Sequence, residues 1–145
     1  MTPPEVDDFL ERSRAGVLTT MGPDGFPHSV AMWFVRDGDE LLMWTYRKSQ
    51  KARNATRDPR AAFLLESGDS YDSLAGVMVK GRLRSIESFD EIVAIGRRLY
   101  DRYTLPLTAM PYDEGPNVEV ERQAAKRIGL ALPLDRVASW DHSKL

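Results

Sequence analysis

The first half of the chain consists largely of short segments in which apolar and β-branched residues cluster or alternate with polar ones, a pattern typical of β-strands. These segments are residues 15–21 (AGVLTTM), 28–35 (HSVAMWFV) and 41–46 (LLMWTY). GPDG at 22–25 is a turn sequence, and Asp37-Gly38 is a strong hairpin signal. Because neither connection has room for a helical crossover, we expect three consecutive antiparallel strands.

Helix signals occur at three other places. Residues 2–5 (TPPE) and 88–91 (SFDE) both have the spacing of a capping box. The first predicts a short amphipathic helix that ends near Gly16, and the second predicts a longer helix with one apolar face. A third helix is predicted to begin at an Asn117 cap and to end at Gly129.

Three further strands are expected at residues 61–66, 74–87 and 130–140. The proline-containing segment 104–116 is expected to be a loop, and it is a candidate for a substrate lid. Six short strands, mostly antiparallel, with helices inserted and appended favour a small closed or split β-barrel over a doubly wound parallel sheet. We expect residues 1–145 to form a single domain.

Composition narrows the possible functions. The chain lacks cysteine, which excludes a disulfide framework, a thiol nucleophile and a thiolate metal site. Its two histidines, His28 and His142, show no metal-binding spacing, so no metal is expected. Apolar runs are far too short to span a membrane and no secretory signal is recognised, so we expect a cytoplasmic protein.

Positive charge is concentrated in one place, although the net charge is −2. Between Arg47 and Arg60 six basic residues stand against a single acid, Asp58. A short helix is predicted from Ser49 to Arg57, so that its N-terminal amides lie beside Lys48 and Lys51, an arrangement that suits a phosphate. A solvated basic helix face is the alternative. Nucleic-acid binding is disfavoured because no recognised motif is present and aromatics do not interleave with the cations.

The basic segment also resembles the phosphate-binding segment of a known family. KSQKARNATRDPRAAFL, preceded by the strand LLMWTY, is similar to the phosphate-binding segment of the pyridoxamine 5′-phosphate oxidase-like, FMN-binding split-barrel superfamily. Ser49, Lys51, Asn54 and residues 58–60 (DPR) match its pattern in order, whereas Ala55 stands where the family usually has Leu or Ile. The similarity covers roughly residues 15–88.

Other stretches resemble one branch of that superfamily. GFPH with WF, KARN with RDPR, and the closing SWDHSKL are most similar to the actinobacterial branch, many of whose members use the deazaflavin coenzyme F-420 in place of FMN. The resemblance implies a mainly β (α+β) fold, a six-stranded antiparallel split β-barrel with flanking helices. It also implies a homodimer that holds each cofactor in a groove between the subunits.

The resemblance assigns residues to three parts of the cofactor. Those at the phosphate are Lys48, Ser49, Lys51 and Asn54; those facing the tail, where F-420 carries a phosphodiester and glutamates, are Arg47, Arg53 and Arg57; those near the ring are Met32, Trp33, Phe34 and Thr45. We further hypothesise that the tail from Trp140 to Leu145 folds over the partner subunit and closes the ring pocket.

The sequence therefore predicts an F-420-dependent oxidoreductase that transfers hydride between the reduced deazaflavin and a planar conjugated small molecule, such as a tetrapyrrole or a quinone. Its chemistry would belong to the cofactor, and the sequence identifies no proton donor. One alternative is an FMN-binding oxidase or reductase of the same family, and another is a non-catalytic flavin- or haem-binding protein. The surplus of arginines favours F-420 over FMN.

Overall fold

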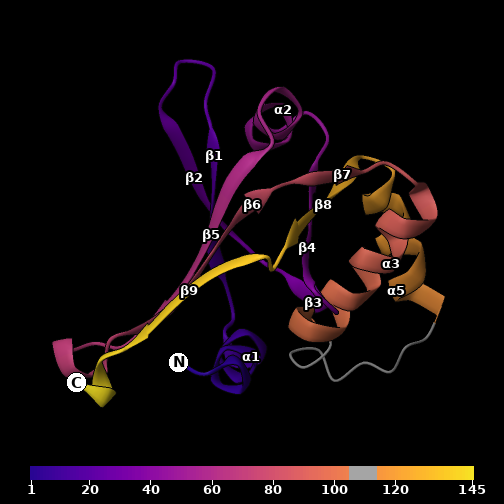
Figure 1. Ribbon diagram of the computed structural model, residues 1–145. Helices are drawn as coiled ribbons and strands as arrows, with labels where there is room; N and C mark the ends of the chain where they lie inside the picture. The colour runs from indigo at the N-terminus through magenta and orange to yellow at the C-terminus, as the bar shows by residue number, and fades with distance from the viewer. Residues whose placement is uncertain (105–113) are drawn as a thin grey trace.

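The computed structural model describes residues 1–104 and 114–145, and side chains for 1–104 and 118–145 (Figure 1). Within the described residues the strands form two antiparallel sheets, a larger one of five strands and a smaller one of four. The larger sheet has the order β2 (Pro27–Met32), β1 (Gly16–Met21), β5 (Arg60–Ser67), β6 (Ala75–Arg82) and β9 (Arg136–Asp141). The smaller has the order β3 (Val35–Asp37), β4 (Glu40–Tyr46), β8 (Arg127–Pro133) and β7 (Arg84–Ile86). The two sheets do not close on each other, so the fold is a split barrel.

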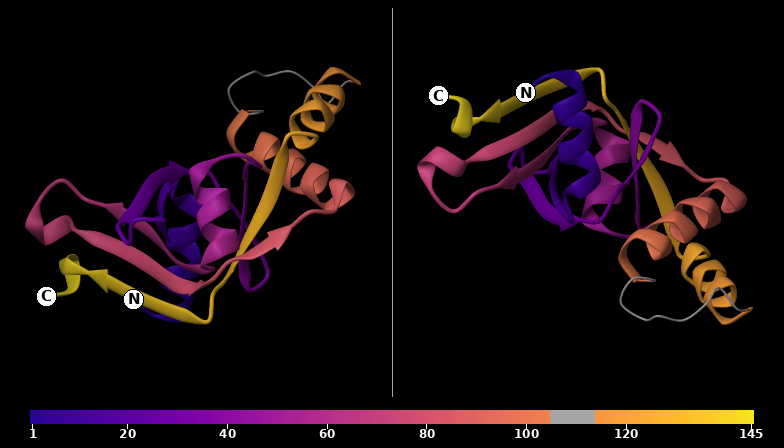
Figure 2. Two further views of the ribbon diagram at one scale, coloured as in Figure 1. Left: turned by 90° about the horizontal axis from the view of Figure 1, so that it is seen from above. Right: turned by 90° about the horizontal axis from the view of Figure 1, so that it is seen from below.

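Helices close the ends and one side of the barrel. Helix α1 (Pro3–Arg12) begins with the predicted capping box, in which the Thr2 amide donates to the Glu5 carboxylate at 2.6 Å. Helix α2 (Gln50–Arg57) connects β4 to β5. Helix α3 (Phe89–Leu99) continues into a π-helical turn, η2 (Tyr100–Thr104), and packs with α5 (Glu114–Ala124) at the end of the molecule remote from the chain termini (Figure 2). Short 3₁₀ turns occur at η1 (Tyr71–Ser73) and η3 (His142–Lys144). No helix of the described residues is both long and apolar enough for a membrane span.

Two apolar clusters hold these layers together. The first lies between the sheets and includes Phe34, Phe63 and Leu130, each fully buried. The second lies between the smaller sheet and helices α3 and α5, where Ile92, Leu99 and Tyr103 are buried. Burial of side chains of this size contributes roughly 1.5–3 kcal/mol each. The clusters fix α2 and the end of β4 relative to each other, which positions the site described below.

The strands are more numerous than predicted, because three of the predicted strands are each divided in two. The expected strand at 28–35 is divided between β2 and β3, and the one at 74–87 breaks at Leu83 into β6 and β7. The expected strand at 130–140 begins earlier, at Arg127, and turns between β8 and β9. Each break is where the chain leaves the larger sheet for the smaller or returns to it, so six predicted strands become nine in the described part of the chain.

The third helix was placed wrongly. Helix α5 begins at Glu114 and ends at Ala124, so Asn117 lies inside the helix and is not its cap. Gly129 belongs to β8, where it pairs with Trp44 and with Ile86. The glycine is required there by close packing, since a Cβ would lie 2.8 Å from the Ile95 side chain. Of the proposed lid, residues 104–116, the part from 105 to 113 lies outside the described residues, while Thr104 belongs to η2 and residues 114–116 to α5.

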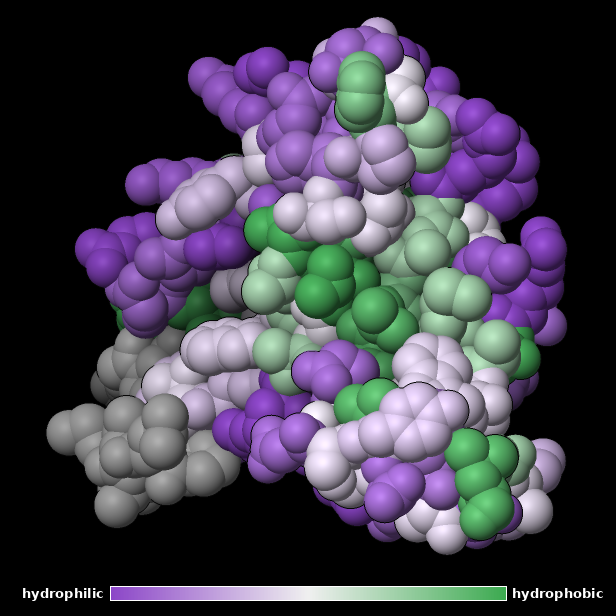
Figure 3. Space-filling model, turned by 90° about the vertical axis from the view of Figure 1, so that its left-hand side faces the viewer, coloured by the Kyte–Doolittle hydropathy of each residue, from purple (hydrophilic) through white to green (hydrophobic). Residues whose placement is uncertain are grey.

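The outer face of the larger sheet carries an apolar row. The strand registers align Ala31, Val17, Leu64, Met78 and Ala138 across all five strands, on the face opposite the core. Figure 3 shows apolar side chains gathered in the middle of this face, with hydrophilic residues around them. A contiguous apolar patch with a polar rim is typical of an interaction surface. We call this row the outer apolar row.

Candidate functional site

The basic segment forms the predicted helix. Ser49 caps α2, because its hydroxyl accepts from the Ala52 amide at 3.3 Å. The same hydroxyl lies 3.1 Å from the Thr45 hydroxyl, which ties the cap to the end of β4. Lys48 is exposed and Lys51 is half-buried. The helix N-terminus and two ammonium groups therefore occupy one small region, as the sequence predicted.

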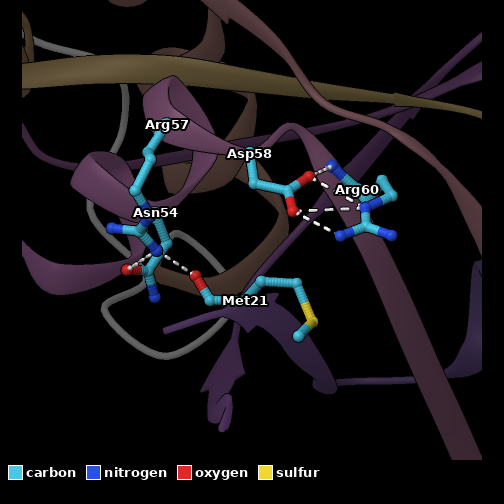
Figure 4. A network of polar contacts seen from close by, with 5 residues as sticks. All are labelled: Met21, Asn54, Arg57, Asp58 and Arg60. Carbon is cyan, nitrogen blue, oxygen red and sulfur yellow. Dashed lines mark hydrogen bonds and ion pairs between the residues drawn. The ribbon is translucent and has the colours of Figure 1, made fainter. Parts of the chain in front are cut away.

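Asn54 is a structural residue in this chain. It is fully buried, and its amide donates to the Thr20 hydroxyl at 3.0 Å while its carbonyl accepts from Gln50 at 2.8 Å. Arg57 also donates to this carbonyl, at 3.0 Å, and to the Met21 backbone carbonyl at the end of β1 (Figure 4). The two residues thus hold α2 against β1, and Asn54 presents no surface to a ligand.

Asp58 and Arg60 form a separate pair beside this network (Figure 4). Their closest side-chain atoms are 2.7 Å apart. Hydrogen bonds from the Arg60 side chain and backbone lower the pKa of Asp58 to about 2. The pair closes the end of α2 and neutralises its own charge, so neither member adds to the unpaired positive charge at the helix start.

Lys51 faces a second cation, Arg127, which the sequence analysis did not select. Burial lowers the pKa of the Lys51 ammonium below its ordinary value, and the charge of Arg127 lowers it further. No carboxylate in the described part of the chain forms an ion pair with either residue. Two like charges brought together without an acid form a site that favours an anion.

Arg127 is held by two aromatic rings. Its guanidinium carbon lies 4.6 Å from the centre of the Trp44 ring and 4.2 Å from that of Tyr46. One terminal nitrogen donates to Gln123 at 3.2 Å, while Nε is buried and has no hydrogen-bond partner. Burial lowers the pKa of the guanidinium. The guanidinium is thus held in place by two rings and has no carboxylate partner among the described residues.

A cleft opens next to Arg127 in the split between the two sheets. It has a volume of about 280 Å³ and is lined by Ala15, Ala31, Met32, Trp33, Trp44 and Arg127; we call it the aromatic cleft. The strand beside it has a free edge, because β3 pairs with β4 only as far as Leu42. The backbone groups of β4 from Met43 to Tyr46 therefore have no strand partner on this side among the described residues.

Trp33 provides a rigid platform in this cleft. Its ring is 54% exposed and stacks on Tyr103 with a centroid distance of 4.6 Å and an interplanar angle of 2°. The Tyr103 hydroxyl is fixed by the backbone of Phe34, donating to its carbonyl at 2.9 Å and accepting from its amide at 3.2 Å. Arg102 adds a bond to the same carbonyl at 3.0 Å. Tyr103 is itself buried, so it supports the platform from the core.

The residues predicted to lie near a ring separate into two groups. Met32 and Trp33 line the aromatic cleft. Phe34 is fully buried and packs edge-on against Phe63, so its side chain belongs to the core. Thr45 is buried and faces Ser49. Trp44, the residue before Thr45, also lines the cleft but was not among the predicted site residues. The alternation of residues along β4 could not show which face of the strand lies at the split.

Two further hollows continue from the aromatic cleft along the start of α2. The first, about 450 Å³, is lined by Tyr46, Arg47, Lys48, Ala125 and Lys126, and we call it the lysine hollow. The second, about 610 Å³, lies between α2 and β7, and its cations are Arg47, Arg53 and Arg57; we call it the arginine cleft. The Arg127 guanidinium, which lines the aromatic cleft, lies over Tyr46, which lines the lysine hollow. Arg47 lines both the lysine hollow and the arginine cleft.

The three spaces are therefore neighbours, one lined mainly by apolar and aromatic residues and two lined largely by cations. Glu87 is the acidic residue among those that line the arginine cleft. The Arg53 side chain makes no hydrogen bond or ion pair with the described residues, whereas that of Arg57 donates to Met21 and Asn54. The cations here whose side chains make no hydrogen bond or ion pair with the described residues are Lys48, Lys51, Arg53 and Lys126.

The C-terminal tail packs on its own chain. Trp140 lies in β9 opposite Gly76, and a Cβ on that glycine would lie 2.2 Å from the Trp140 ring. His142 follows, with Nδ1 2.9 Å from the Tyr71 carbonyl, and Lys144 pairs with Glu5 at 2.5 Å. The predicted contact of this tail with a partner subunit stays a prediction. Among the described residues no group of His, Cys, Asp or Glu could hold a metal ion.

Comparison with known proteins identifies the family. The sequence profile described as pyridoxamine 5′-phosphate oxidase matches residues 2–140. The chain belongs to the pyridoxamine 5′-phosphate oxidase family. No curated protein gives a significant match.

Solved structures agree with this family assignment. A conserved hypothetical protein from Mycobacterium tuberculosis is 41% identical, with a TM-score of 0.89 over 99% of this chain and 87% of that one. An F-420 reductase is 30% identical, with a TM-score of 0.66 over 91% and 94%. A FAD- and haem-binding protein from Mycobacterium smegmatis, 18% identical with a TM-score of 0.74 over 97% and 71%, shares the fold. This family has a flavin-binding fold, which matches the predicted superfamily.

Proposed function

We propose that this chain binds coenzyme F-420 and transfers hydride between it and a small planar conjugated acceptor, such as a tetrapyrrole or a quinone. The observation that carries the proposal is that an aromatic cleft, a lysine hollow and an arginine cleft are neighbours, since Arg127 of the first lies over Tyr46 of the second and Arg47 lines the last two. F-420 has the same order of parts, namely a ring, a phosphodiester and a glutamate tail. The 30% identity to an F-420 reductase supports the same coenzyme.

The donor set fits such a ligand. At the phosphate, Lys48, Lys51 and the amides that follow Ser49 would each supply a charge-assisted hydrogen bond, worth roughly 1.5–3 kcal/mol. Asn54 would act indirectly, by holding α2 in place. Arg47 and Arg53 would face the glutamates. Met32, Trp33 and the free edge of β4 would surround the ring.

The bound coenzyme would supply the reactive ring carbon. The chain would bind the coenzyme, orient its ring toward the acceptor and shield both from water. Trp33 and Trp44 both line the aromatic cleft, so the ring would lie beside aromatic side chains. In this position one face of the ring would be shielded from water. An acceptor would then approach the ring from the open split between the sheets. A flat acceptor suits a slot with aromatic walls, because stacked rings gain about 0.5–1.5 kcal/mol beyond their burial.

The proposal includes a second copy of the chain. The outer apolar row is the part of the described surface that a partner of identical shape could cover by twofold symmetry. A dimer through this face would also place the open side of the aromatic cleft near the partner, since Ala31 belongs to both features.

FMN is the alternative ligand, favoured by the family profile. It has a ring and one phosphate but no anionic tail, so it would fill the aromatic cleft and the lysine hollow and leave the arginine cleft empty. The two ligands therefore differ in their dependence on Arg53. Substitution of Arg53 by Ala should weaken F-420 binding and leave FMN binding unchanged.

The test is a fluorescence titration of the purified protein with F-420 and with FMN. Lys51→Ala should weaken F-420 binding about ten- to hundredfold, the effect of losing one charge-assisted bond. Arg12→Ala is the matched control, because Arg12 is an exposed cation on α1 paired with Asp8. Tight binding of FMN without binding of F-420 would identify FMN as the cofactor instead. Absence of binding by both would reject the site.

A further inference from the structure

Arg127 is the one cation of the site whose geometry the phosphate does not explain. Its guanidinium is clamped by Trp44 and Tyr46, so it cannot swing toward the start of α2 without losing both ring contacts. It lines the aromatic cleft, in which the ring of the coenzyme is proposed to lie. Its Nε–H is buried without an acceptor. Arg127 therefore places a permanent positive charge at the wall of the cleft in which the ring would lie.

The surroundings of Arg127 leave its charge uncompensated. Its guanidinium contacts the side-chain oxygen of Gln123 and two aromatic faces, none of which carries a full negative charge. Lys51 is the neighbouring ionised group, and it is also positive. A guanidinium does not release its proton under ordinary conditions, so Arg127 can act only by binding or by electrostatics, and not as an acid.

We propose that Arg127 stabilises the negative charge that the coenzyme ring gains when it is reduced. Addition of a hydride, which is one proton and two electrons, to an uncharged ring carbon leaves one negative charge on the conjugated N–C=O portion of the ring. The donor loses both electrons and the proton. An opposite charge within about 4–6 Å changes such an equilibrium by roughly ten- to thousandfold. Arg127 thus makes the site selective for the reduced, anionic form.

This inference rests on the proposed function, and the experiment separates the two. The dissociation constants of oxidised and reduced F-420 are measured by calorimetry under anaerobic conditions, and their ratio gives the shift in reduction potential on binding. Wild type should bind the reduced form at least tenfold more tightly. Tenfold corresponds to a rise of about 30 mV for a two-electron couple. If neither form binds, the proposed function fails; if both bind equally, only the role of Arg127 fails.

Two variants isolate the charge from the packing. Arg127→Gln removes the charge and should abolish the preference for the reduced form. Arg127→Lys also loses the planar stacking but keeps the charge, so it should retain most of the preference. Arg12→Gln removes one positive charge from a remote exposed position and should behave as wild type. Equal behaviour of the Gln and Lys variants would overturn the proposal. The wild-type ratio tests it even if neither variant folds.

Discussion

At the residue scale, Asn54 shows how one position can match a binding motif and yet be buried. The motif spacing placed the Asn54 amide at a phosphate. In the structure this amide donates to the Thr20 hydroxyl instead, which lies 34 positions earlier in β1. Helical periodicity explains the outcome, because Ala52 and Ala55 also face the core from α2. Asn54 therefore supports the cation-bearing helix from below.

Substitution of Asn54 should consequently affect stability. We expect Asn54→Ala to lower the free energy of unfolding by about 1–3 kcal/mol, because the buried Thr20 hydroxyl loses its partner and Arg57 loses one of its two acceptors. Urea unfolding measures this change. Gln50→Ala removes a single bond to the same side chain from an exposed position and should cost no more than about 0.5 kcal/mol. Equal losses in the two variants would contradict the supporting role.

The residue that sequence analysis missed shows the limit of local patterns. Ser49 and its helix could be predicted, because a cap, a helix start and flanking cations are adjacent in sequence. Arg127 reaches the same site only through the pairing of β4 with β8, which places it opposite Tyr46 some eighty positions away. A basic pair, Lys126-Arg127, ahead of an apolar strand was the available signal. By itself it indicated only the start of a strand.

At the element scale, the two ends of the chain are joined. Glu5 in α1 pairs with Lys144 in η3, and this hydrogen bond, together with one from the Thr2 backbone, lowers the pKa of Glu5 to about 2. A carboxyl group with a depressed pKa in the folded state stabilises the fold above its unfolded pKa. That contribution is lost as the pH falls through the folded value.

The expected pH dependence follows from this sign. Wild type should be more stable than Lys144→Gln near neutral pH, and the difference should disappear as the pH falls from about 4.5 to about 2. Urea unfolding at a series of pH values measures it, and the Glu5 carboxyl resonance should titrate near pH 2 only in wild type. A difference that persists at pH 2 would mean that Lys144 acts through packing. Both groups are exposed, so the effect is expected to be small.

The strand breaks belong to the same scale. Sequence alternation identified the apolar segments, but it could not show that Leu83 and the turn after Pro133 transfer the chain between sheets. The inward side chains continue through each break, so the pattern reads as one long strand. What decides the break is the twist needed to bring β7 and β8 beside β4, and that depends on the whole sheet.

At the scale of the whole molecule, the open split and the outer apolar row are related features. A closed barrel would bury the edge of β4, whereas here the edge from Met43 onward borders the aromatic cleft. The row of Ala31, Val17, Leu64, Met78 and Ala138 ends at Ala31, which lines the same cleft. A partner seated on the row would therefore extend to the cleft and supply a second wall.

A charge placed in the middle of the row tests this relation. The double variant Val17→Lys and Met78→Lys should be a monomer of about 16.4 kDa by sedimentation, whereas wild type should have twice that mass, because two buried ammonium groups per subunit would oppose association. Phe89→Lys, at the exposed start of α3, is the control and should leave the mass of wild type unchanged. Both side chains point away from the core, so the monomer should keep its unfolding transition.

If the groove between subunits completes the site, the monomer should also bind F-420 at least tenfold more weakly. A monomeric wild type, or a monomeric variant with full affinity, would show that one chain suffices.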